Sequence, residues 1–148
     1  MKVAVLMGSP NDKDKMAGAA QMLERFGIEV DERVLSAHRN PAEVTALASG
    51  LRDNGYVAAI CGAGMAAHLA GVVAAHTTLP VIGVPLSGGA LNGVDALYST
   101  VQMPKGIPVA TVAVDGSANA GILVAEMLSI SNEDIAKKLD EFRAAGAR

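Results

Sequence analysis

Short, uninterrupted apolar runs recur along this chain, and each is followed by a segment with helical periodicity. The runs Val3–Met7 and Ala58–Cys61 contain no polar side chain alternating with the apolar ones. Unbroken runs of this kind are typical of parallel strands buried on both faces, because the helices that connect parallel strands cover both sides of the sheet. The sequence therefore predicts an α/β fold with a central parallel sheet and helices on both faces.

The chain of 148 residues predicts a single domain spanning residues 1–148, with no linker or internal repeat. Strands are expected at Val3–Met7, Glu29–Leu35, Val57–Cys61, Val81–Val84 and Val109–Val114. The expected helices are one with Met16, Ala20 and Leu23 inward that stops at Gly27, one from Asn40 and Pro41 to Gly55, one at Ala66–His76, and one at about 118–128. A last helix, capped by Ser131, presents Ile135, Leu139 and Phe142 to the core.

The segment 54–94 contains no Asp, Glu, Lys or Arg. It does not predict a membrane span, because glycines and prolines interrupt it and no apolar run approaches the roughly 20 residues that a spanning helix needs. Within this segment, the helix expected at Ala66–His76 is apolar on nearly every side. A second subunit is the expected cover for such a helix in so small a chain, so we expect a homo-oligomer.

Charge and cysteine content exclude several classes of partner and compartment. The net charge is -3 and the isoelectric point is near 5.5, which leaves no basic surface for nucleic acid or an anionic membrane. The single cysteine, Cys61, cannot form an intramolecular disulfide, and the apolar run after Met1 and Lys2 is too short for a secretory signal. We therefore expect a cytoplasmic protein.

Four loops that follow expected strands carry polar or glycine-rich motifs: GSPND, SAHRNP, GAGMAAH and PLSGG. In an open parallel sheet such loops emerge at one edge, and ligands bind there where the strand order reverses. Residues far apart in the sequence are therefore expected to converge on one site. PLSGG fits either a lid over a substrate or a merely flexible loop.

The motif SAHRNP, from Ser36 to Pro41, has the most informative chemistry. Arg39 can bind a phosphate through two hydrogen bonds, and the imidazole of His38 can accept and return a proton. The combination indicates a phosphorylated substrate that undergoes proton transfer. The alternative interpretation makes Arg39 a solvated surface charge and Ser36 a turn residue.

The other two polar loops are ambiguous by themselves. Ser9 and the helix start after it offer a hydroxyl and backbone N–H groups to a phosphate, but Asn11 or Asp12 could instead cap that helix. The glycines around Gly64 suit either a ligand or a tight turn, and His68 is either functional or structural. No spacing in these loops predicts a metal site.

The motifs MGSPND, SAHRNP, GAGMAAHLAG and GVPLSGGALNGVDALYSTVQMPKGIPVATVAV, with the spacing between them, resemble the PurE family of de novo purine biosynthesis. The resemblance covers nearly the whole chain. It implies a flavodoxin-like three-layer α/β/α sandwich and an octameric assembly. It also implies a reaction that moves a carboxyl group on aminoimidazole ribonucleotide, without metal or organic cofactor.

The resemblance also implies roles for individual residues. By position, His38 matches the family's proton-transferring histidine. Arg39 and Ser9 match its phosphate or ribotide contacts, and Asp12 matches the acid that holds the ribose hydroxyls.

Gly64 and His68 match the family's loop beside the base and the migrating carboxyl group. The chain departs from the family pattern at Asn11, where serine is common, and at Met65 and Ala70, where one branch often has glycine and proline. The Asn11 amide can still donate a hydrogen bond to a phosphate.

Two reactions occur in the family that the chain resembles. One branch, the mutase, shifts the carboxylate of N5-carboxyaminoimidazole ribonucleotide to the ring carbon, and the other carboxylates aminoimidazole ribonucleotide directly. The loop GAGMAAHLAG keeps the frame of the mutase branch, so a mutase is expected. The alternatives are direct carboxylation and a nucleotide-sensing domain without activity. A flavin carrier is disfavoured because the chain has no Trp and only 2 Tyr and 2 Phe to stack on the flavin.

Overall fold

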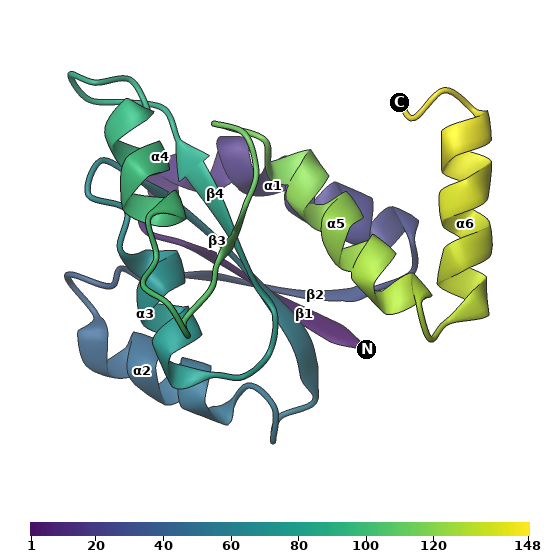
Figure 1. Cartoon of the computed structure of the whole chain (residues 1–148), viewed down its shortest axis with the longest axis horizontal. Coiled ribbons are helices and arrows are strands. Elements are labelled where there is room, and N and C mark those ends of the chain that lie inside the picture. The colour runs from purple at the N-terminus through teal and green to yellow at the C-terminus, as the bar shows by residue number, and fades with distance from the viewer.

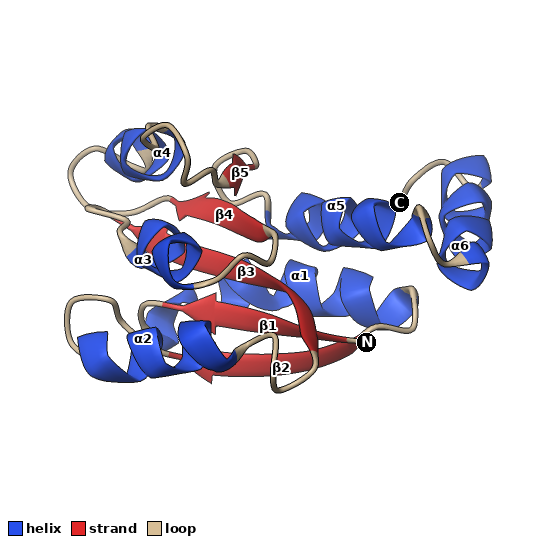
Figure 2. Cartoon of the chain, turned by 60° about the horizontal axis from the view of Figure 1, so that its bottom comes forward, coloured by secondary structure: helices blue, strands red, loops and turns tan.

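A computed structural model describes all residues, 1–148, and is built on one parallel sheet of five strands in the order β2-β1-β3-β4-β5. The strands are β1 (Lys2–Met7), β2 (Glu29–Val34), β3 (Tyr56–Gly64), β4 (Val81–Leu86) and β5 (Ala110–Thr111). This order is the flavodoxin-like one, in which the direction of winding reverses between β1 and β3. The predicted α/β fold with a parallel sheet is confirmed, and the arrows of Figure 2 point the same way.

Helices cover both faces of the sheet and complete three layers (Figure 1). The helices are α1 (Lys13–Arg25), α2 (Pro41–Gly50), α3 (Leu69–His76), α4 (Val94–Val101), α5 (Ser117–Ser129) and α6 (Glu133–Ala144), and a 3-10 turn, η1 (Pro10–Asp12), precedes α1. α1 and α5 lie on one face, and α2, α3 and α4 on the other. No helix is long and apolar enough to cross a bilayer.

The sheet has a separate apolar core on each side. One core joins alternate residues of β1, β3 and β4 to α1, α5 and α6, and Val5, Ile60 and Leu23 are fully buried in it. The other joins the opposite faces of β1 and β3 to α2 and α3. Burial on both faces explains why β1 and β3 read as continuous apolar runs.

β3 is longer and α3 shorter than the sequence predicts. Gly62, Ala63 and Gly64 continue the ladder with β4 instead of forming a loop. Met65 then takes a left-handed backbone conformation with φ 55°, and α3 begins only at Leu69. The expected start at Ala66 is therefore wrong, because a residue with positive φ breaks the chain direction before the helix.

β5 is shorter than expected, and α4 has no counterpart among the predicted elements. The ladder between β4 and β5 pairs only Ile82 and Gly83 with β5 residues. The Pro85 carbonyl accepts a hydrogen bond from the Asp115 N–H. Because proline has no N–H, Pro85 cannot donate the hydrogen bond that would extend the pairing of β4 with β5. Only Ala96 and Thr100 of α4 are buried, so this helix has too few inward-facing apolar residues for a helical pattern to be recognised in the sequence.

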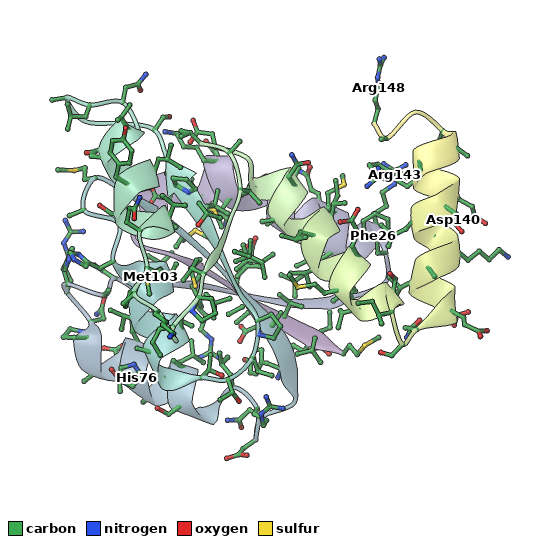
Figure 3. All side chains as sticks on the ribbon, in the orientation of Figure 1. Phe26, His76, Met103, Asp140, Arg143 and Arg148 are labelled. Atoms are coloured by element: carbon green, nitrogen blue, oxygen red, sulfur yellow. The ribbon has the colours of Figure 1, made fainter.

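α6 packs at one end of the molecule, against α5 and the end of α1. The expected residues Ile135, Leu139 and Phe142 are its buried ones. Phe26 lies between α6 and the rest of the chain (Figure 3), with its ring edge-on to Phe142 at a centroid distance of 5.6 Å.

The cap predicted for α6 is corrected by one residue. Asn132, not Ser131, is the N-cap, and its Oδ1 accepts a hydrogen bond of 3.0 Å from the Ile135 N–H. Asn and Ser are about equally good caps, so the residue whose oxygen reaches the third N–H of the helix takes the role.

Replacement of Gly121 by alanine should destabilise the fold, because α1 and α5 cross there at very short range. A Cβ at Gly121 would lie 2.7 Å from the backbone oxygen of Ala19, which cannot move aside as a flexible side chain can. We expect Gly121→Ala to lower the free energy of unfolding by about 1–3 kcal/mol in urea denaturation. The control Asn119→Ser, at an exposed position of the same helix, should change it by less than about 0.5 kcal/mol. Equal stability of the two variants would contradict this close crossing.

Candidate active site

One pocket, of about 540 Å³, lies at the carboxyl-terminal edge of the sheet and is formed by the loops after β1, β2, β3 and β4. It lies where the strand order reverses, which is the usual place for a ligand in an open α/β sheet. Every candidate residue from the sequence lines it: Ser9, Asn11, Asp12, Ser36, His38, Arg39, Gly64 and His68. The structure thus brings together residues from three separate loops.

A larger groove, of about 960 Å³, lies at the opposite edge of the sheet. It runs past the last residue of α3, His76, which Figure 3 labels beside α2. The polar groups there serve local structure: His76 Nδ1 is 2.8 Å from the Val72 carbonyl oxygen, and Arg52 donates to the Thr78 hydroxyl. None of the polar loops that follow the strands reaches this groove, so the smaller pocket is the candidate site.

The loop after β1 gives the pocket a capped helix start and a carboxylate. The Ser9 hydroxyl accepts a hydrogen bond of 3.2 Å from the Asn11 N–H and so caps η1. Asp12, one of the two residues considered as a cap, does occupy the N-cap position of α1. The Asp12 side chain forms no cap hydrogen bond, which leaves its carboxylate available to a ligand.

The electrostatic environment of Asp12 favours a partner for its carboxylate. Partial burial raises the pKa of Asp12 above its ordinary value, and the backbone of Ser9 and the charge of Lys15 oppose this effect. A carboxylate that has lost water without gaining full compensation is stabilised by hydroxyl donors of a ligand. Asp12 is also the only acidic residue that lines the pocket.

The loop after β2 is a tight turn held by its own hydrogen bonds. The Ser36 carbonyl accepts from the Asn40 N–H at 2.8 Å, and the Ser36 hydroxyl accepts from the Arg39 N–H at 3.3 Å. Ser36 is therefore a turn residue as well as part of the pocket wall. Asn40 precedes Pro41 as expected, but its side chain accepts from the Ser36 N–H instead of capping α2.

Arg39 lines the pocket with an exposed side chain, and no carboxylate of the chain lies within ion-pair distance of its guanidinium. A guanidinium without an acidic partner keeps its full charge and all of its donors for an anion. The turn around Ser36 fixes the backbone from which it extends. The geometry is therefore that of an anion-binding cation.

His38 and His68 both line the pocket, and their rings are in direct contact. His38 Nε2 lies 2.7 Å from His68 Nδ1, and the two rings meet edge to face with centroids 4.8 Å apart. At that distance one ring nitrogen donates and the other accepts, so each ring fixes the tautomer of the other. A histidine oriented in this way can give up and take back a proton at a defined position.

The loop after β3 explains one of the departures from the PurE pattern. The φ of Met65 is 55°, a region that favours glycine, so a glycine at this position would relax the backbone. The other departure, Ala70, lies in the first turn of α3, where proline is also accepted because no N–H bond is lost. Met65 lines the pocket, whereas Ala70 does not.

The loop after β4 adds a set of polar residues that the sequence analysis did not identify. Lys15 Nζ donates to the Ser87 carbonyl oxygen at 2.6 Å and to the Ser87 hydroxyl at 2.8 Å. Ser87 in turn donates to Asp115, through its N–H at 2.9 Å and through its hydroxyl. Seventy-two residues separate Lys15 from Ser87, and no local motif connects them.

Known proteins resemble this chain over nearly its whole length. An N5-carboxyaminoimidazole ribonucleotide mutase of Vibrio vulnificus is 50% identical over 146 residues, which cover 97% of this chain and 91% of that protein. A phosphoribosylaminoimidazole carboxylase of Candida glabrata is 51% identical over 140 residues, which cover 95% of this chain but only 25% of that protein.

A solved structure shows the same architecture. The crystal structure of Treponema denticola PurE matches with a TM-score of 0.89 and 29% identity, and the match covers 99% of this chain and 91% of that one. The sequence model of the family described as AIR carboxylase matches residues 2–148. With its relatives, its fold and its sequence model in agreement, the chain belongs to the AIR carboxylase family, the PurE family whose motifs it carries.

Proposed function

We propose that the chain is an N5-carboxyaminoimidazole ribonucleotide mutase, which moves the carboxylate of its substrate from the exocyclic nitrogen to the ring carbon. The observation that carries this proposal is the paired His38 and His68 in a pocket that also holds an unpaired Arg39. The curated relatives named as mutases support it, because this chain spans 91% of the Vibrio vulnificus protein and 83% of the Thermotoga maritima one.

The pocket has a suitable group for each part of a ribonucleotide. Arg39 and the hydroxyl of Ser9 bind the phosphate, and the Asn11 amide adds a donor. Asp12 accepts hydrogen bonds from the ribose hydroxyls, which compensate the burial of its carboxylate. The base then lies toward Gly64 and the two histidines.

The reaction needs one group that both gives and takes a proton. The carbamate carbon–nitrogen bond breaks, its electron pair stays on the nitrogen, the nitrogen takes up a proton, and carbon dioxide is released within the pocket. The ring carbon then bonds to the carbon of carbon dioxide and loses its own proton. One proton enters and one leaves, so a single shuttle at His38 balances the reaction, with His68 holding its ring in place.

Two alternatives remain testable. Direct carboxylation of aminoimidazole ribonucleotide has support from the name of the Candida glabrata relative, but this chain spans only a quarter of that protein. A nucleotide-sensing domain would need Arg39 and Asp12 but no proton shuttle, so the histidine pair disfavours it. No metal or organic cofactor enters the proposed reaction, and a cytoplasmic location stays a prediction.

We also propose that the chain works as a homo-oligomer, most simply the octamer expected from the resemblance. The segment expected in the interface, α3, has its main apolar residues buried within the subunit. α4 instead carries an apolar stripe that faces outward: Val94 is 52% exposed, Tyr98 63% and Val101 45%. Leu91 and Met65, beside the pocket loops, are also exposed, so a second copy on this surface would help to close the pocket.

The test of the proposed reaction supplies each substrate separately. We expect the protein to convert N5-carboxyaminoimidazole ribonucleotide without added bicarbonate, as followed by product absorbance. Aminoimidazole ribonucleotide with carbon dioxide at physiological concentration should give little product, because the pocket is proposed to recapture carbon dioxide and not to collect it from solution. Efficient turnover of only the second substrate would overturn the mutase assignment, and ribonucleotide binding without turnover of either would favour the sensing domain.

The variant His38→Asn should keep the fold and ribonucleotide binding but lose turnover by about 10²–10⁴-fold, because an amide cannot accept and return a proton. Steady-state kinetics and calorimetric binding measure the two effects separately. Arg39→Ala is the contrasting variant. It should mainly weaken binding, by about 1.5–3 kcal/mol for a charge-assisted phosphate contact. Near-normal turnover of His38→Asn would remove His38 from the mechanism.

The variant Tyr98→Glu should break the proposed subunit contact, because it places a charge in the middle of the α4 stripe. Light scattering at micromolar concentration should then report a smaller particle than the wild-type assembly. Ile130→Glu is the matched control, since Ile130 is 88% exposed but lies outside the stripe. A wild-type particle of 15.0 kDa would contradict the oligomer.

A further inference from the structure

The glycine-rich loop after β4 forms one wall of the pocket but makes little contact of its own. Gly88 and Gly89 line the pocket, and residues 88–92 are all exposed. A Cβ at Gly88 would meet no atom within 4 Å. The position of this wall therefore depends on the residues that hold the two ends of the loop.

The first end is held by Ser87. Its carbonyl and hydroxyl oxygens accept two hydrogen bonds from Lys15 Nζ, and its N–H and hydroxyl donate to the two carboxylate oxygens of Asp115. Lys15 Nζ also lies 3.9 Å from Asp115 Oδ1. All polar groups of Ser87 are thus bound from two directions, by α1 and by the segment after β5.

The second end of the loop returns to the same place. Gly93 has φ 95°, and a Cβ there would lie 2.7 Å from Val114 and 3.2 Å from the Cα of Ser87. The segment from Ser87 to Gly93 is therefore a loop whose first and last residues lie next to each other, beside Asp115. A shift of Ser87 would move both ends together.

Asp115 holds an unfavourable backbone conformation in order to reach Ser87. Its φ is 58°, in the left-handed region, which Asp and Asn adopt more readily than other non-glycine residues but still less readily than glycine. Burial alone would raise the pKa of Asp115, but the Ser87 hydrogen bonds and the Lys15 charge hold it below its ordinary value. The contact is thus charged at neutral pH and compensates the backbone strain.

We propose that Lys15, Ser87 and Asp115 form a positioning unit, the Ser87 clamp, that keeps the Gly88–Gly89 wall closed and so retains carbon dioxide during the carboxyl transfer. This inference rests on the proposed mutase function, because only a reaction with a free carbon dioxide intermediate needs such retention. The clamp touches no reacting atom. It acts by fixing the wall beside Met65, since a Cβ built at Gly89 would lie 3.4 Å from the Met65 side chain.

A direct phosphate contact is the main competing role for Lys15. Its ammonium group already donates to two oxygens of Ser87 and lies near the Asp115 carboxylate. Its hydrogen-bond donors and its charge are therefore already engaged by the protein and are less available to a phosphate. Arg39, by contrast, has no acidic partner. The two roles predict different kinetics: loss of a phosphate contact raises KM, whereas loss of the wall lets carbon dioxide escape.

The test uses substrate labelled with ¹³C in the carbamate, in buffer with unlabelled bicarbonate, and mass spectrometry of the product. The wild-type protein should retain most of the label. Lys15→Met and Asp115→Asn should each raise the ratio of released aminoimidazole ribonucleotide to product by about tenfold, corrected for spontaneous decay of the substrate. Asparagine suits position 115 because it tolerates positive φ.

Two controls separate the clamp from a general loss of stability. Lys13→Met removes an exposed lysine from the same helix and should leave retention unchanged. The double variant Lys15→Met/Asp115→Asn should release no more than the worse single variant, because both residues act through Ser87. Unchanged retention in both single variants would overturn the proposal, as would a rise in KM alone.

A second measurement does not depend on the substrate. Hydrogen exchange of the hydrogen-bonded backbone amides of Ser87, Val94 and Asp115, at the ends of the loop, should be faster in Lys15→Met than in wild type or Lys13→Met. If the wild-type protein fails to convert the labelled substrate, the proposed function is wrong. The clamp is then judged by exchange alone, and equal exchange in the variant and the controls would overturn it.

Discussion

Parallel pairing of β1 with β2 on one side and with β3 on the other is the constraint on which the site depends. It sends the chain to opposite sides of β1, so the loops after β1 and β3 separate and leave room between them. The loop after β2 then brings His38 toward His68, although the two residues belong to different crossovers. The starts of α1 and α3 both lie at the pocket, since Asp12 and Leu69 line it.

The charges at this edge suit an anionic ligand that also carries hydroxyl groups. Arg39 is free of acidic partners, and Asp12 is the one acid in the pocket wall. The nearby lysine, Lys15, already donates to two oxygens of Ser87, which is why we propose that it supports the wall and does not bind the ligand. In these two proposals, Arg39 binds the phosphate and Lys15 helps to retain the intermediate.

Most of the site could be predicted from the sequence, because its signals are local. His38 and Arg39 are adjacent, and Ser9 and Asp12 lie within one turn. Strand-to-helix alternation then places these loops at one edge without any knowledge of side-chain contacts. Asp12 and Asn40 occupy predicted N-cap positions without a side-chain cap hydrogen bond. The cap predicted at Ser131 was wrong because two adjacent polar residues compete at that helix start, and the backbone geometry selects Asn132.

The sequence by itself determined the α/β class, the two buried strands β1 and β3, and the residues that gather in the pocket, since apolar runs and short motifs report burial and local chemistry directly. Tertiary structure alone decided the short β5, which ends opposite Gly83, two residues before Pro85, and the outward-facing α4. It also decided the contact of Lys15 with Ser87 across 72 residues. The physical reason is that these features depend on which groups meet across the sheet, and neither periodicity nor spacing along the chain contains that information.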